Sequence, residues 1–142
     1  MIAFDTNILV YAHRRDSAFY SRAKDCVRTH SEGTAAWAIP WPCVHEFLAV
    51  VTNPRIFQSP TPLSVAIAQV DAWRESQRLR LLAEEDGYWE VLADLLKSSR
   101  VIAGKVHDAR IAALALYHGA SELLSADRDF SRMGPLVVRN PL

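Results

Sequence analysis

Apolar positions follow two spacings along this chain, and each spacing predicts a different secondary structure. Short apolar runs predict strands at residues 2–4, 36–39, 79–83, 122–125 and 136–139. Between them, apolar residues recur every three or four positions, which predicts helices at 8–12, 17–30, 44–51, 62–73, 86–96 and 111–117. Strands that alternate with helices predict an α/β fold, with a mainly parallel sheet covered on both faces.

Prolines and a candidate N-cap residue refine these boundaries. Three prolines between residues 53 and 62 exclude a helix or central strand there and predict a loop. Thr61 followed by Pro62 predicts the N-cap and first position of the next helix. Arg55 and Phe57 lie in this loop and are candidates for contact with a partner or RNA, because binding residues concentrate on loops. The helix at 111–117 is apolar almost throughout and should be central.

Composition limits the function classes. The chain has 142 residues, half of them hydrophobic, which predicts one domain spanning residues 1–142. No apolar run reaches membrane-spanning length, and Asp5 and Asn7 interrupt any signal peptide, so we expect a cytoplasmic protein. Cys26 and Cys43 lack CxxC spacing, which argues against a disulfide framework or zinc site. Sixteen basic and sixteen acidic residues balance, so only local basic patches could contact phosphates.

Four carboxylates occur where a strand or loop is expected to meet a helix: Asp5, Glu46, Asp108 and Asp127. Three of them are expected near the carboxyl ends of strands, where open α/β sheets bind ligands, so they could converge on one pocket. Each also has a purely structural explanation. Asp5 and Asp108 could be N-caps, Glu46 could be a solvated helix residue, and Asp127 with Asp129 could form an Asx turn.

Convergence of these groups would require a cation. Carboxylates a few ångströms apart repel one another and raise one another's pKa values. Mg²⁺ and Mn²⁺ prefer hard oxygen ligands and would remove that repulsion. Two-metal phosphodiesterases hold their ions about 3.5–4 Å apart, which requires an acidic cluster. The pattern therefore predicts a metal-dependent nuclease in which Asp5, Glu46, Asp108 and Asp127 are the catalytic and metal-binding residues.

The motifs that carry these carboxylates resemble those of a PIN-domain ribonuclease, and most closely a VapC-type toxin of a type II toxin–antitoxin system. They are hydrophobic-Asp-Thr-Asn at the N-terminus, Glu46, His-Asp-Ala-Arg-Ile-Ala-Ala at 107–113 and Leu-Ser-Ala-Asp-Arg-Asp-Phe at 124–130. The resemblance covers the whole chain. It maps the four carboxylates onto the family's metal positions, Asp129 onto a further acidic position, and Thr6, Asn7 and Ser125 onto supporting groups. Ser125 stands where relatives often have Thr, which keeps the hydroxyl.

The resemblance also implies properties that no motif in this chain displays. They are a three-layer α/β/α sandwich, dependence on Mg²⁺ or Mn²⁺, endonucleolytic cleavage of RNA such as tRNA or rRNA, a homodimer and a VapB-type antitoxin. Two alternatives stay open at this point. The chain could be a non-catalytic binding module on the same fold, or a housekeeping PIN nuclease in RNA maturation.

Competing motifs fail on spacing. Asp127-Arg128-Asp129 resembles the loop of haloacid-dehalogenase phosphatases, but only thirteen residues follow it. Read as an EF-hand, the same loop has Arg132 in place of the required glycine. Ala49 interrupts an HExxH zinc motif after His45, and no serine lies in a GxSxG elbow. His107 and His118 are expected to be helix-end residues.

Overall fold

The computed structural model describes residues 1–142 and is built around a five-stranded sheet. Its strands are β1 (Ile2–Phe4), β2 (Trp37–Pro40), β3 (Leu79–Leu82), β4 (Glu122–Leu124) and β5 (Val138–Arg139). The spatial order is β3-β2-β1-β4-β5, and every neighbouring pair is parallel. Ile2 of β1 pairs with Trp37 on one side and Glu122 on the other, so β1 is the central strand.

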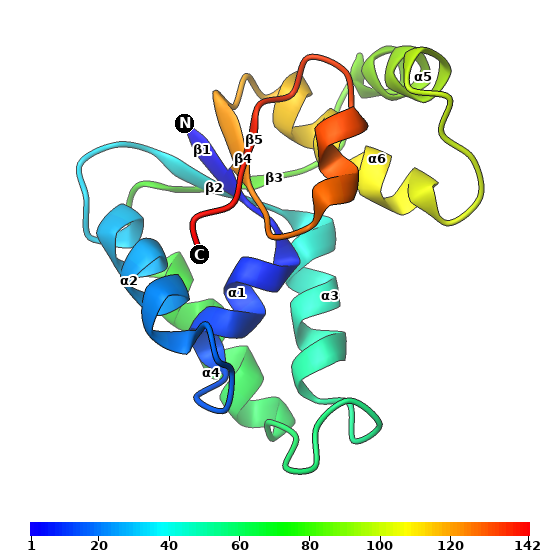
Figure 1. Cartoon of the computed structure of the whole chain (residues 1–142). Helices are drawn as coiled ribbons and strands as arrows, with labels where there is room; N and C mark the ends of the chain where they lie inside the picture. Colours follow the sequence, from blue (N-terminus) through cyan, green and yellow to red (C-terminus); the bar gives the residue numbers. More distant parts are fainter.

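Six α-helices flank the sheet: α1 (Thr6–His13), α2 (Tyr20–Ser31), α3 (Trp41–Val51), α4 (Leu63–Arg74), α5 (Tyr88–Ser98) and α6 (Lys105–Tyr117). A short 3₁₀ helix, η1 (Arg128–Arg132), follows β4. Figure 1 shows α1 to α4 grouped on one side of the sheet and α5 with α6 on the other. This arrangement confirms the predicted three-layer α/β/α sandwich.

The core explains why the central elements are apolar. Ala3, Phe4, Leu123 and Leu124 have no exposed surface, as expected for parallel strands covered on both faces. The segment of α6 from residue 111 to 115 is buried throughout, which confirms that this helix is central. Trp37 and Trp73 also lie in the core, whereas Trp89 is 65 % exposed and does not.

Several predicted boundaries were wrong, because side chains that looked like caps are used elsewhere. Helix α6 begins at Lys105, so Asp108 lies within its first turn and is not its N-cap. Pro62 is the N-cap of α4, and the Thr61 hydroxyl contacts His13 and Arg14 instead. Helix α2 begins three residues later than predicted, at Tyr20, and the last strand is only two residues long.

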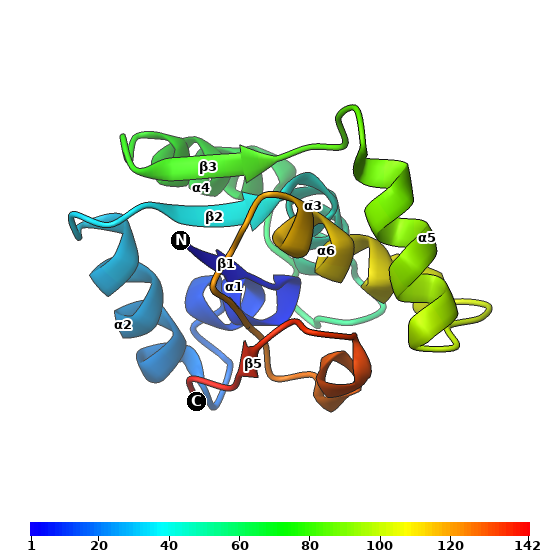
Figure 2. The ribbon, with the colours of Figure 1, turned by 90° about the horizontal axis from the view of Figure 1, so that it is seen from above.

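The order of the strands determines where a ligand can bind. From β1 the chain moves to β2 and β3 on one side, and later returns to β4 and β5 on the other. Figure 2 shows β1 between these two halves when the sheet is seen from above. A crevice opens at such a switch point beyond the carboxyl ends of the strands. Asp5 directly follows β1, and Asp127 lies three residues after β4, so both flank this point.

Two further features are the composition of the helices and the state of the two cysteines. None of the helices combines the length and apolar composition that a membrane span requires. Cys26 and Cys43 are both free thiols, and Cys43 is fully buried in the core. The single domain expected over residues 1–142 stays a prediction.

Candidate metal centre

Asp5 is the most deeply buried carboxylate of the site, with 4 % of its surface exposed. It is the N-cap of α1, and its Oδ1 accepts a hydrogen bond of 2.8 Å from the backbone N–H of Thr6. Its Oδ2 accepts hydrogen bonds from Asn7 Nδ2 at 2.9 Å and from the Ser125 hydroxyl at 2.7 Å. Capping and membership of the acidic site are therefore compatible roles of one side chain.

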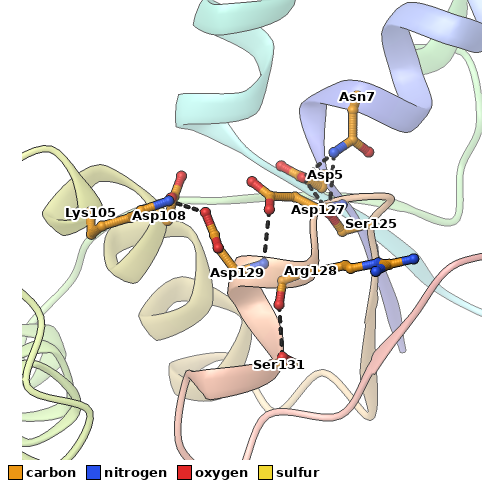
Figure 3. A network of polar contacts seen from close by, with 9 residues as sticks. All are labelled: Asp5, Asn7, Lys105, Asp108, Ser125, Asp127, Arg128, Asp129 and Ser131. Carbon is orange, nitrogen blue, oxygen red and sulfur yellow. Dashed lines mark hydrogen bonds and ion pairs between the residues drawn. The ribbon is translucent and has the colours of Figure 1, made fainter.

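Ser125 and Asn7 connect the ends of β1 and β4. The Ser125 hydroxyl donates to Asp5 and accepts from the backbone N–H of Asp127 at 2.9 Å and from Asn7 Nδ2 at 3.2 Å. Asn7 Oδ1 accepts from the backbone N–H of Ala126 at 3.1 Å. These bonds join residues almost 120 positions apart, and they fix the start of the Asp127 loop relative to Asp5 (Figure 3).

Glu46 reaches the site from the middle of α3, where its side chain is exposed. Its Oε2 accepts a hydrogen bond of 3.0 Å from the Thr6 hydroxyl, which holds the carboxylate beside the start of α1. Cys43, one turn earlier on α3, places its Sγ 3.8 Å from Asp5 Oδ1. Helix α3 thus contributes a carboxylate and a weak thiol donor to the same region.

Asp108, Asp127 and Asp129 form the second group of carboxylates. One oxygen from each lies within 4.8 Å of the others. Asp108 comes from the first turn of α6, and Asp127 is the N-cap of η1. Asp127 Oδ1 accepts from the backbone N–H of Asp129 at 2.8 Å and so forms the Asx turn that was the structural alternative for these residues. The turn presents both aspartates towards α6 (Figure 3).

Lys105 is the one cation that contacts this group. Its ammonium forms an ion pair with Asp129 and lies 3.8 Å from Asp108 Oδ2. Figure 3 shows the lysine side chain reaching from α6 towards Asp129. These carboxylates raise the pKa of Lys105, chiefly through the hydrogen bond with Asp129. One monovalent cation therefore neutralises part of the cluster.

The proton affinities reflect burial and mutual repulsion. Burial raises the pKa of Asp5 to about 6, against the opposing effect of the Ser125 and Thr6 hydrogen bonds, and the charges of Glu46 and Asp108 raise it further. Burial also raises the pKa of Asp108, and the charge of Asp127 is the next largest cause. The site thus holds negative charges that destabilise one another without a multivalent cation.

A cavity of about 400 Å³ connects the two groups of carboxylates. Asp5, Glu46, Asp108 and Asp127 all line it, together with Thr6 and Asn7. Asp129 lies outside this cavity, on the far side of the Asp108–Asp127–Asp129 cluster. The rest of the lining is apolar and consists of Val10, Tyr11, Val50, Ile56, Phe57, Ile111 and Phe130.

The donor set fits a hard divalent cation. Carboxylate oxygens surround the cavity, while its lining contains no histidine or cysteine side chain that would favour a softer metal. Asp108, Asp127 and Asp129 are close enough for shared coordination, and the cavity leaves room for water ligands. Asp5 and Glu46 lie on the other side of the cavity and could bind an ion directly or through water.

The structure brings all four predicted carboxylates to one cavity, and it places Thr6, Asn7 and Ser125 in contact with them. Sequence reasoning did not assign Lys105 to the cluster. Its position three residues before Asp108 on a helix was the available signal, because such residues share a face. In the 53–62 loop, Phe57 lines the cavity and packs under Arg14, whereas Arg55 is exposed and is not part of the lining.

Comparison with known proteins places these features in a family. The PIN domain family matches residues 2–135. Ribonuclease VapC48 of Mycobacterium tuberculosis is 30 % identical over 138 residues, covering 97 % of this chain and 95 % of that protein. VapBC2 of Rickettsia felis, solved with a promoter DNA fragment, superposes with a TM-score of 0.71 at 21 % identity, covering 99 % of this chain and 98 % of that chain.

A second solved structure shows the same fold. VapC20 of Mycobacterium tuberculosis, described as a toxin that cleaves the sarcin–ricin loop, superposes with a TM-score of 0.69 at 20 % identity. The superposition covers 99 % of this chain and 100 % of that chain. Both solved structures confirm the PIN-like fold.

Proposed function

Because this chain belongs to the PIN-domain family and is similar over its whole length to VapC ribonucleases, we propose that it is a metal-dependent endoribonuclease. The observation that carries the proposal is the convergence of Asp5, Glu46, Asp108 and Asp127 on one cavity at the switch point of the sheet. Hydrolysis of a phosphodiester needs charge neutralisation and an oriented water molecule, and this donor set is suited to both.

In this proposal the carboxylates bind the metal ion together. Asp108 and Asp127 would hold a divalent ion, Mg²⁺ or Mn²⁺, and Asp5 and Glu46, which line the same cavity, would bind it directly or through water. Asp129 is a further ligand for which Lys105 competes. When bound, the ion would activate the attacking water and neutralise charge that develops on the phosphate.

The supporting residues keep the carboxylates in place. Ser125 and Asn7 orient Asp5 through two hydrogen bonds to Oδ2, and Thr6 orients Glu46 through its hydroxyl. Such partners align ligands and hold them in the ionised form, so their loss lowers metal affinity and activity. The apolar wall at Val10, Tyr11 and Phe57 excludes water from one side of the cavity and strengthens electrostatic interactions inside it.

The biological role proposed here is that of a VapC-type toxin that acts on tRNA or rRNA in the cytoplasm, with a VapB-type antitoxin as its partner and a homodimer as its assembly. The similarity to VapC48 over nearly the full length of both proteins supports the toxin over a housekeeping PIN nuclease. The retained carboxylates and their supporting hydrogen bonds favour an enzyme over a non-catalytic binding module.

The test is cleavage of a total-RNA pool by partner-free protein with Mg²⁺, Mn²⁺ or chelator, followed by sequencing of the fragment ends. We expect cuts at few sites that require the metal and disappear in Asp5→Asn. A suitable control is Asp25→Asn, because Asp25 is an exposed aspartate on α2 whose only side-chain partner is Arg28. Absence of cleavage by folded, metal-loaded wild-type protein would refute the proposal.

A further inference from the structure

A second, smaller cavity of about 180 Å³ lies on the Asp129 side of the metal cluster. It is formed by the loop between α5 and α6 and by the end of η1. Three of its lining residues are basic, namely Arg100, Lys105 and Arg132, and Asp129 is its only acidic residue. Three cations against one carboxylate make this the cationic side of a site whose main cavity is acidic. We refer to it as the basic cavity.

The arginines of the basic cavity are available to a ligand. Neither Arg100 nor Arg132 forms an ion pair or a side-chain hydrogen bond within the chain, and both are exposed. By contrast, Arg14, Arg28, Arg74 and Arg139 each form an ion pair with a carboxylate. The backbone at Arg100 has a φ of 52°, in the left-handed region that non-glycine residues rarely adopt. The cavity is thus lined by two unpaired guanidinium groups, one at a turn after α5 and one at the end of η1.

The basic cavity and the metal cluster share one residue, Asp129, and Lys105 connects them. Asp129 lines the basic cavity and is also one of the three carboxylates within 4.8 Å of one another. Lys105 lines the basic cavity and forms an ion pair with that same aspartate (Figure 3). A ligand held at the cluster would therefore extend directly into cationic surroundings.

Electrostatics favour a phosphate as that ligand. The chain has no net charge, and carboxylates line the main cavity, so an approaching polyanion meets repulsion unless cations lie close by. Arginine binds phosphate in a bidentate manner and retains its charge under all physiological conditions. A nucleic-acid strand carries phosphates at regular intervals, so one at the cluster brings a neighbour towards Arg100 and Arg132.

We propose that the basic cavity of Arg100, Lys105 and Arg132 binds a backbone phosphate of the RNA strand, adjacent to the phosphate that is cleaved. This proposal rests on the proposed ribonuclease function and assigns to that site the contact that orients the strand. Because phosphate contacts carry no base information, the cavity fixes the register and affinity of RNA without selecting its sequence.

The test measures binding of a labelled RNA hairpin by fluorescence anisotropy, with Mg²⁺, in an Asp5→Asn parent that does not cleave. Arg100→Ala with Arg132→Ala should weaken binding about tenfold at 0.15 M salt and lower the slope of log affinity against log salt by about 1.4, or about 0.7 for each lost cation on a single strand. Arg100→Lys with Arg132→Lys should restore most of the slope.

The matched control removes two arginines that are also exposed and unpaired. Arg22 lies on α2, and Arg78 immediately precedes β3, so Arg78 lies at the edge of the sheet opposite the site. Arg22→Ala with Arg78→Ala should leave the slope unchanged, which separates a local contact from loss of overall charge. In the wild-type background, which cleaves RNA, Arg100→Ala with Arg132→Ala should raise KM more than it lowers kcat.

Two outcomes would overturn the inference. If the Arg100 and Arg132 variant bound RNA as tightly as the parent, or lost no more affinity than the control pair, the basic cavity would not be a phosphate site. If the variant bound a poly-glutamate peptide more weakly than the parent but bound RNA equally well, the cavity would be a binding site for an acidic protein. Failure of the parent to bind any RNA would instead refute the ribonuclease function itself.

Discussion

The two groups of carboxylates differ in how the fold holds them. Asp5 is almost fully buried, and three hydrogen-bond donors from Thr6, Asn7 and Ser125 fix its two oxygens. Asp108 and Asp129 are partly exposed, with 28 % and 52 % of their side-chain surface accessible, and their partner is the exposed side chain of Lys105. Asp5 is built into the core, whereas Asp108 and Asp129 lie nearer the surface.

This difference indicates a division of labour. A buried carboxylate with every donor in place is oriented before any ligand arrives, which is the condition for electrostatic catalysis. An open cluster with a replaceable counter-ion can exchange water and lysine for a metal. We therefore expect substitutions in the open group to act on metal binding and cleavage, and substitutions of the buried Asp5 to act on stability as well.

The largest effect on activity is expected from Asp108→Asn. The change keeps the size of the side chain but removes a charge from the open group, so cleavage should fall by at least about 100-fold, because a catalytic metal contributes several kcal/mol to the transition state. The melting temperature should hardly change. The measurement is the initial cleavage rate of Asp108→Asn beside that of the control Asp94→Asn, which changes an exposed aspartate of α5. A fully active Asp108→Asn protein would remove Asp108 from the site.

The next largest effect concerns the pH dependence of stability without metal. The pKa of Asp5 is about 6 in the folded chain against 3.8 in the unfolded one, so the folded state binds the proton more tightly. Stability from this group is greatest below pH 4 and decreases as the pH rises towards 6, by up to about 3 kcal/mol. Urea unfolding in chelator from pH 4 to 7.5 should show this decrease relative to Asp5→Asn.

Metal binding should depend on pH in the opposite direction to the stability of the metal-free protein. A divalent ion binds the ionised form, so Mn²⁺ affinity should rise as the pH increases through 6 and level off above 7. Equal pH profiles for the stability of wild type and Asp5→Asn would show that burial does not perturb Asp5, and the contrast between the two groups would lose its basis.

A smaller effect is expected from Ser125→Ala, which removes the hydroxyl that bridges the two groups. Asp5 loses one donor and the Asp127 loop loses an acceptor, so stability should fall by about 1–3 kcal/mol and metal affinity by about 10–100-fold. Ser125→Thr keeps the hydroxyl and should retain most of the metal affinity. Calorimetric Mn²⁺ titration and chemical unfolding measure both quantities. If alanine and threonine variants bound metal equally, the hydroxyl would have no orienting role.

The smallest effect is expected from Lys105→Met, which removes the cation from the open group but keeps the length of the side chain. Mn²⁺ should then bind a few-fold more tightly, the size expected of an exposed ion pair. Lys97→Met on α5 is the control, because Lys97 is exposed and has no acidic partner. Weaker Mn²⁺ binding in Lys105→Met would show that the lysine supports the metal rather than competing with it.

Sequence patterns predicted those features that depend on neighbouring residues. The strand before Asp5 and the loop at 53–62 are local, and the structure confirms both. The Asx turn from Asp127 to Asp129 is also local and was one of the two explanations left open for these residues. The carboxylates converge because parallel strands end at one edge of a sheet, which the alternation of strands and helices already implied.

Other features depend on packing between distant elements and could not be predicted. Lys105 meets Asp129 across 24 residues only because η1 packs against α6. Helix α6 begins at Lys105, before the residue 111 that the apolar pattern indicated, so Asp108 lies in its first turn and not at a cap position. Threonine is a common N-cap residue, but the Thr61 hydroxyl forms hydrogen bonds with His13 and Arg14 instead.

The most direct test of the account is the number of Mn²⁺ ions bound at pH 7.5 by wild type, Asp108→Asn and Asp25→Asn, counted by electron paramagnetic resonance of free Mn²⁺. The account predicts that wild type and Asp25→Asn bind Mn²⁺ tightly, and that Asp108→Asn loses the tight site while it remains folded. Equal binding by all three proteins would show that the cluster on α6 and η1 is not the metal site, and the central claim would be contradicted.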